Sequence, residues 1–152
     1  MAQGKLDRAE DAAREQLTIC TNLFSNDHAD VAHALHTLAR VLQKRDKLVN
    51  AEEAAQQAVA IFEKKTLNDG RPFTARVTLG EILLAQKRYP DAESWLHSGW
   101  QGLESRKSVL KVSEKERLKD ALQGLEQICA ETNRPNDAEN WRRKLTEFER
   151  AK

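Results

Sequence analysis

The feature that most constrains this chain is an Ala-Glu pair that recurs at a nearly constant interval. The pair occurs at Ala9-Glu10, Ala51-Glu52, Ala92-Glu93 and Ala138-Glu139, which gives intervals of 42, 41 and 46 residues. A short polar stretch comes before each pair, and these stretches read GKLDR, DKLVN, KRYPD and NRPND. Self-similarity with a period of roughly 20–50 residues is typical of stacked structural repeats. The sequence therefore predicts a repeat protein with a turn ahead of each pair.

Apolar and small residues around each pair are spaced by three and four positions, which indicates one face of an α-helix. Upstream of the pairs, Leu38-Ala39 precedes Leu42 in one copy, and Leu79-Gly80 precedes Leu83 in the next. Each unit is thus expected to be a helix A, a short turn and a helix B. The alanine of the pair is expected where helix B crosses the preceding helix, since small side chains let helix axes approach closely.

Seven helices are predicted, and the chain is expected to be a single helical-repeat domain. The predicted helices span roughly 5–24, 28–44, 47–65, 72–87, 90–105, 113–132 and 135–150. The predicted units are 1–26 (helix B of a truncated first repeat), 27–67, 68–110 and 111–152, the last with a C-terminal capping helix. Ser113 followed by Glu116 predicts a capping box. The long interval of 46 is attributed to extra residues around 105–112.

The two ends of the predicted array differ. The last helix has one apolar stripe, formed by Ala138, Trp141, Leu145 and Phe148, as a terminal cap requires. The first helix is apolar on more than one side, although no helix A precedes it. We therefore expect the chain to be a C-terminal fragment of a larger protein. We also expect the first helix to offer apolar surface for self-association.

Composition fits long amphipathic helices, with 39% hydrophobic residues, 32% charged residues, six Gly and three Pro. The formal charge of +1, from 25 basic and 24 acidic residues, gives no reason to expect nucleic-acid or membrane binding. Because neither a membrane-spanning apolar run nor a secretion signal is found, a cytoplasmic location is expected. Cys20 and Cys129 both lie in apolar helical patterns and are expected to be unpaired thiols. A disulfide would require two distant helices to meet.

No arrangement of residues predicts catalysis, a cofactor or a metal site. His28, His33 and His36 lie near Asp27 and Asp30, but only His33 and His36 clearly share a helix face. Zinc normally needs three or four ligands in a defined geometry, so polar surface histidines are the favoured interpretation. No glycine loop for phosphates, zinc-protease motif or serine elbow is found. The three tryptophans are interpreted as packing residues, and the chain is not expected to be an enzyme.

The phrases HADVAHALHTLARVL and NAEEAAQQAVAIFEKK resemble the tetratricopeptide repeat of the kinesin-light-chain type. That resemblance implies an all-α superhelix of antiparallel helix pairs, a TPR-like solenoid. A looser similarity is carried by YPDAESWLHSGWQGLE and by ALQGLEQICAETNRPNDAENWRRKL. These segments resemble the closing part of repeat arrays attached to large bacterial serine/threonine protein kinases, which makes a kinase-related protein the leading candidate for the parent.

The resemblance also implies a non-catalytic scaffold that binds a protein or peptide on the concave surface lined by the A helices. The residues expected to line that surface are His33, His36, Thr37, Arg40, Thr74, Val77, Thr78, Glu81, Asp120, Gln123 and Gln127. The asparagines that often hold a peptide backbone in kinesin-light-chain repeats are replaced here, so the partner stays open. The alternative is a structural module for oligomerisation or for packing against other domains of the parent.

Overall fold

The computed structural model describes residues 2–65 and 68–151, which fold into α-helices, a short 3-10 turn and loops, with no strand. The elements are α1 (Ala2–Leu23), α2 (Ala29–Lys44), α3 (Leu48–Lys64), α4 (Arg71–Ala85), α5 (Tyr89–Glu104), η1 (Lys107–Val109), α6 (Val112–Glu131) and α7 (Pro135–Arg150). The seven predicted helices are confirmed, with boundaries that differ by at most three residues. The all-α fold class is confirmed as well.

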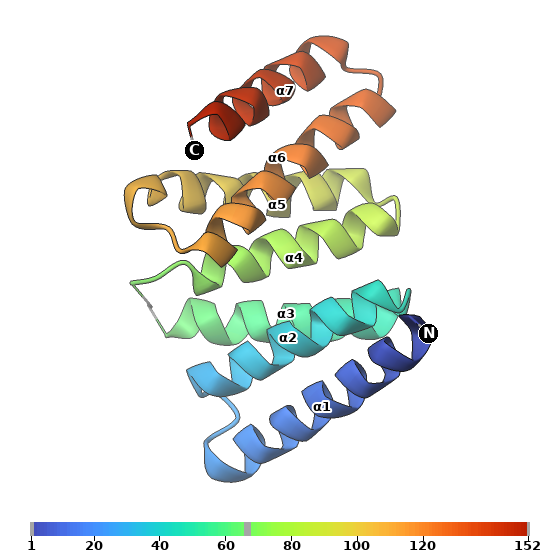
Figure 1. Cartoon of the computed structure of the whole chain (residues 1–152), viewed down its shortest axis with the longest axis vertical. Coiled ribbons are helices and arrows are strands. Elements are labelled where there is room, and N and C mark those ends of the chain that lie inside the picture. Colours follow the sequence, from blue (N-terminus) through green and yellow to red (C-terminus); the bar gives the residue numbers. More distant parts are fainter. Residues whose placement is uncertain (1, 66–67, 152) are drawn as a thin grey trace.

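Each helix packs against the next one in the chain, so that the array grows along one axis from α1 to α7 (Figure 1). In addition, α2 contacts α4, and α4 contacts α6. These three are the A helices of the repeat, and their mutual contacts make them one layer of the array. The B helices α1, α3, α5 and α7 form the other layer. The fold is therefore the predicted TPR-like superhelix of helix pairs.

The turns inside the helix pairs share one backbone device. Asp46, Lys87 and Asn133 each have positive φ, of 58°, 60° and 57°, and each lies between a helix A and its helix B. A left-handed residue after a helix ends it and reverses the chain. The turn predicted at GKLDR is wrong, because α1 already begins at Ala2 and runs through Gly4 and Lys5.

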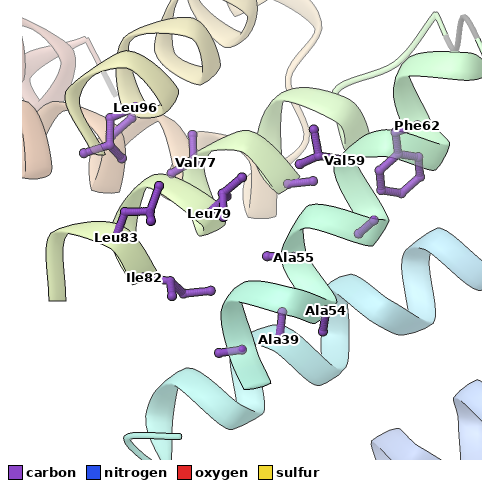
Figure 2. Packing of buried hydrophobic residues seen from close by; sticks show 14 of the residues in the cluster. Ala39, Ala54, Ala55, Val59, Phe62, Val77, Leu79, Ile82, Leu83 and Leu96 are labelled. Atoms are coloured by element: carbon purple, nitrogen blue, oxygen red, sulfur yellow. The ribbon is translucent and has the colours of Figure 1, made fainter. Parts of the chain in front are cut away.

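The recurring alanine lies where it was predicted to lie. Ala51 and Ala92 are fully buried, and Ala138 is 5% exposed, whereas Ala9 is only half-buried. Figure 2 shows the surrounding core between α2, α3, α4 and α5, with Ala39, Ala55, Leu79 and Leu96 among its members. The packing of small residues against apolar neighbours holds the interior units together.

The glutamate of the pair links each unit to the next. The Glu10 carboxylate accepts hydrogen bonds from Arg45 and from Lys47, at 2.9 Å for Lys47 Nζ. Glu52 accepts from Gln86 and Arg88, each at 2.8 Å. Both glutamates thus lie on a helix B and bind the turn of the following repeat.

Glu93 makes a third contact of this kind, because it accepts two hydrogen bonds from Arg134, at 3.0 and 2.8 Å. We call the contacts of Glu10, Glu52 and Glu93 with the following repeat the inter-repeat ladder. Glu139 of the last unit differs, since its side chain is 69% exposed and, among the described residues, pairs only with Arg142 of α7. The sequence analysis did not foresee the ladder. Its signal was present as a basic residue at the turn position of each later unit, at Lys47, Arg88 and Arg134.

The long interval of 46 residues comes mainly from one extra turn at the start of α6. This helix has 20 residues, against 16 in α2 and 15 in α4. Its first residue is Val112, and the Glu114 carboxylate accepts a hydrogen bond from the Lys111 backbone N–H at 2.8 Å. The predicted capping box at Ser113 is therefore wrong by two positions, because the helix begins before Ser113.

The two ends of the array differ as the sequence indicated. On α7, Ala138 and Phe148 are buried, while Trp141 and Leu145 pack half-buried against the core. On α1, the described residues include two buried ones, Glu10 and Ala13. Near its end, Ile19, Leu23 and Phe24 are 49%, 70% and 39% exposed. None of the described helices is long and apolar enough to cross a membrane.

Candidate ligand groove

The layer of A helices carries two adjoining hollows, of about 300 and about 320 Å³, which we call the inner groove. Asp120 of α6 borders both hollows and so connects them. The groove takes side chains from α2, α4 and α6, which belong to three different repeats. The predicted residues that line it are His33, His36, Thr37, Arg40, Thr74, Glu81, Asp120, Gln123 and Gln127.

The two remaining predicted residues, Val77 and Thr78, do not reach the groove, because both side chains are fully buried. Val77 faces α5 instead, where only a glycine fits opposite it: a Cβ on Gly99 would come within 2.6 Å of a Val77 methyl carbon. Thr78 is hydrogen-bonded to His36. Both residues lie on the helix that the sequence analysis predicted, but on its face that packs inward and not on the face that lines the groove.

His36 fixes α2 against α4 at the floor of the groove. Its Nε2 lies 2.8 Å from the Thr78 hydroxyl oxygen, and its side chain is mostly covered, with 8% exposure for the residue. Burial, followed by the charges of Arg40, Arg117 and His33, lowers the pKa of His36 to about 3. The interpretation as a surface histidine is wrong for His36. The signal was its position between Ala32 and Ala39, at helical spacing on a face of small residues.

Arg117 joins α6 to α4 in the wall between the two hollows. One guanidinium nitrogen donates to Glu81 and to Asp120, each at 2.6 Å, while the Nε is buried without a partner among the described residues. Burial raises the pKa of Glu81, and the nearby Arg117 charge opposes that shift. The sequence analysis missed Arg117. Its signal was the spacing of three residues from Asp120 on one helix.

The extra turn of α6 adds residues to the groove that the repeat pattern did not predict. Lys111, Ser113, Glu114 and Glu116 line the hollow of about 300 Å³ together with Arg71 of α4. The insertion therefore builds one wall of the groove, opposite α2. The sequence analysis aligned the repeats on the positions that recur in each unit. These residues lie in an insertion that has no equivalent in the other units.

Free positive charge remains in this hollow. The Arg40 side chain is exposed, and among the described residues no carboxylate lies within ion-pair distance of it. Arg71, in contrast, is paired with Asp69 at 2.8 Å, and Arg117 is neutralised by its two carboxylates. An acidic group of a ligand would find Arg40 available without displacing an existing partner.

The other residues singled out from the sequence do not form a chemical centre. Within residues 2–65 and 68–151, no three His, Cys, Asp or Glu side chains are grouped as a metal ion would need. Cys129 is buried and Cys20 is half-buried, and both are free thiols. Trp100 and Trp141 pack edge to face, with ring centroids 4.9 Å apart, and Trp95 packs half-buried against the core.

Residues 1–64 match the family model of the tetratricopeptide repeat. No curated protein is similar enough in sequence to match. Among solved structures, BtubC (BKLC) from P. vanneervenii is similar over 97% of this chain, with a TM-score of 0.79 and 16% identity. The chain spans 58% of that protein's length.

A Podosopora anserina protein described as a kinesin light chain with nearly identical TPR-like repeats is also similar. Its structure aligns with 97% of this chain at a TM-score of 0.68 and 17% identity, and the alignment covers 69% of that protein. A single-residue variant of the same protein gives a TM-score of 0.70, 18% identity and the same coverage of this chain, with 68% of the other chain covered. The resemblance to the tetratricopeptide repeat is thus confirmed in sequence for residues 1–64, and the fold of nearly the whole chain is similar to that of kinesin-light-chain-like repeat structures.

Proposed function

We propose that this chain is a non-catalytic scaffold that binds a peptide segment of a partner protein along the inner groove. Tetratricopeptide repeats typically mediate contacts between proteins, and the described fold is of that type. The observation that carries the proposal is geometric. Nine residues chosen from three repeats, on sequence alone, border two hollows that share Asp120.

The groove favours an extended peptide that carries an acidic side chain. Arg40 offers an unpaired guanidinium at one end, beside His33 and Thr37. At the other end, Gln123 and Gln127 are exposed, and an amide side chain can both donate to and accept from a peptide backbone. The neutral, buried His36 contributes shape to the floor and carries no charge near neutral pH.

The test is a selection of displayed random peptides, each about a dozen residues long, on the wild-type protein, followed by affinity measurement with Arg40→Glu. Peptides containing Asp or Glu should be selected, and Arg40→Glu should weaken their binding about tenfold or more, since one charge pair contributes on the order of 1–2 kcal/mol. Lys64→Glu is the matched control, because Lys64 is exposed on α3, in the other layer. Equal losses in both variants, or no selected peptide, would contradict the proposal.

A second candidate function is self-association through α1, and the exposed Ile19, Leu23 and Phe24 favour it. Three large exposed apolar side chains near one helix end offer a contact surface between copies. Sedimentation equilibrium at several concentrations tests this candidate. If it is correct, Leu23→Asp should shift the mass toward the monomer, whereas a monomer mass for the wild type at every concentration would exclude it.

The association with a larger, kinase-related bacterial protein stays a prediction from the sequence. It rests on the similarity of the segments near residues 89–104 and 121–145 to repeat arrays of that kind. An antibody raised against this array, used on lysate of the source cells, would detect a band well above 17.3 kDa if the prediction is correct.

A further inference from the structure

A second groove, of about 350 Å³, lies where α6 begins and α7 ends. Figure 1 shows the start of α6 and the C-terminus of α7 on the same side of the array. The groove is lined mainly by Lys107, Val112, Lys115, Lys119 and Phe148, and we call it the lysine groove. It is separate from the inner groove, with which it shares only Glu116 among the lining residues.

The extra turn of α6 creates this groove as well. Val112 is the first residue of the helix, and it is 75% exposed, so its side chain is not part of the core. Lys115 and Lys119 lie four residues apart on one face of α6, and Lys111 lies four residues before Lys115, just ahead of the helix. Phe148 of α7 is nearly buried, and the Lys107 ammonium lies 5.9 Å from the centre of its ring. An apolar floor is thus bordered by positive charge.

The lysines have donor capacity left for a ligand. Lys107 is paired with Glu104 at 3.1 Å, and Lys119 with Glu149 at 2.7 Å. Lys115 is exposed, and no carboxylate of the described residues lies within ion-pair distance of it. An ammonium group has three donors, so the paired lysines can each donate to a further carboxylate oxygen.

We propose that the lysine groove binds an acidic peptide segment of another protein, with one large apolar side chain of that segment placed against Phe148 and Val112. Carboxylates on either side of the apolar residue would pair with Lys115 and with Lys107 or Lys119. A peptide fits better than a flat anionic bilayer, because Glu104, Glu116 and Glu149 stand among the lysines and would meet the bilayer surface directly. A peptide can place its charges between them.

The first test is a titration of the ¹⁵N-labelled protein with three short synthetic peptides of equal length, followed by NMR. One peptide is rich in Asp and Glu around a central Leu-Phe, one replaces Leu-Phe by Gly-Gly, and one replaces the acidic residues by Lys. The first should shift the amide signals of Val112, Lys115, Lys119 and Phe148, and the other two should bind about tenfold more weakly or worse. No shift with the first peptide, or shifts confined to the inner groove, would overturn the proposal.

The second test uses matched variants of the same protein. Lys115→Glu and Val112→Ser should each raise the dissociation constant of the first peptide, about tenfold for the charge reversal. Lys64→Glu and Val49→Ser are their controls, since Val49 is 69% exposed on α3. Arg40→Glu should leave the peptide-induced shifts of the Val112 and Lys115 amide signals unchanged, which separates binding at the lysine groove from binding at the inner groove.

Losses in the controls as large as those in the groove variants would overturn the proposal. So would binding of phosphatidylserine vesicles that Lys115→Glu abolishes, if the peptide fails to bind.

Discussion

The same helix crossing is built in two different ways in the middle and at the end of this array. Between α4 and α5, Gly80 lies under Leu96, and a Cβ at Gly80 would come within 2.6 Å of the Leu96 Cγ. At the equivalent positions of α6 and α7, Glu126 accepts a hydrogen bond from Arg142 at 2.8 Å. Leu96 is fully buried, whereas the Arg142 side chain is 57% exposed.

The difference shows what each crossing has to do. An interior helix B is covered on two sides, so a large apolar residue there needs a partner with no side chain of its own. The last helix B is covered on one side, and water reaches the crossing. Water lowers the cost of a charged pair and also reduces its contribution to stability. Close packing thus gives way to an ion pair where water reaches the crossing.

The largest effect should come from truncation at the two equivalent positions. Leu96→Ala removes a fully buried side chain that lies against both Gly80 and Gly124, and should lower the free energy of unfolding by about 2–5 kcal/mol. Arg142→Ala should change it far less, because the ion pair is solvent-exposed. Urea unfolding of both variants gives the comparison. Similar losses at the two sites would show that the last crossing is packed like the interior ones.

A smaller effect is expected when the interior crossing is overfilled. Gly80→Ala places a methyl group 2.9 Å from the Leu96 backbone nitrogen, where the helices must move apart. Overpacking of this kind costs about 1–3 kcal/mol, which the better helix propensity of alanine offsets by about 1 kcal/mol. We therefore expect a net loss, measured by thermal unfolding. Glu126→Ala, the matched change at the last crossing, should leave the midpoint nearly unchanged.

The interior should also show a dependence on pH that the end lacks. His36 has a pKa of about 3 when folded and about 6.5 when unfolded, so below pH 6.5 the unfolded chain binds a proton that the folded chain excludes. Stability should therefore fall as pH falls, by about 2 kcal/mol between about pH 7 and pH 5. His36→Gln should remove this dependence within that window. An unchanged slope in the variant would mean that other groups cause the loss.

The helices were predictable because their signal is local and repeated. Spacings of three and four, with Pro90 and Pro135 in the first turns of α5 and α7, determine where helices form. The burial of individual side chains could not be predicted, because it depends on how the repeats are rotated relative to one another. Val77, Thr78 and His36 each lie on the expected helix, but neighbouring helices cover them, and only the stacked array decides that. The role of the α6 insertion was hidden because it has no counterpart in the other units.

The smallest effect concerns the inter-repeat ladder. It tests whether the glutamate of the Ala-Glu pair contributes to stability through its contact with the next repeat or through its own helix. Glu93 joins its helix to the next repeat through two bonds from Arg134, while Glu139, at the same place in the repeat, pairs with Arg142 of its own helix. Glu93→Gln should lower the urea midpoint slightly, and more so at low salt, because screening weakens partly exposed ion pairs. Glu139→Gln should leave the midpoint unchanged at any salt concentration. If both variants lose stability equally, the glutamate acts within its own helix, through the helix dipole, and the bridging contact contributes nothing of its own.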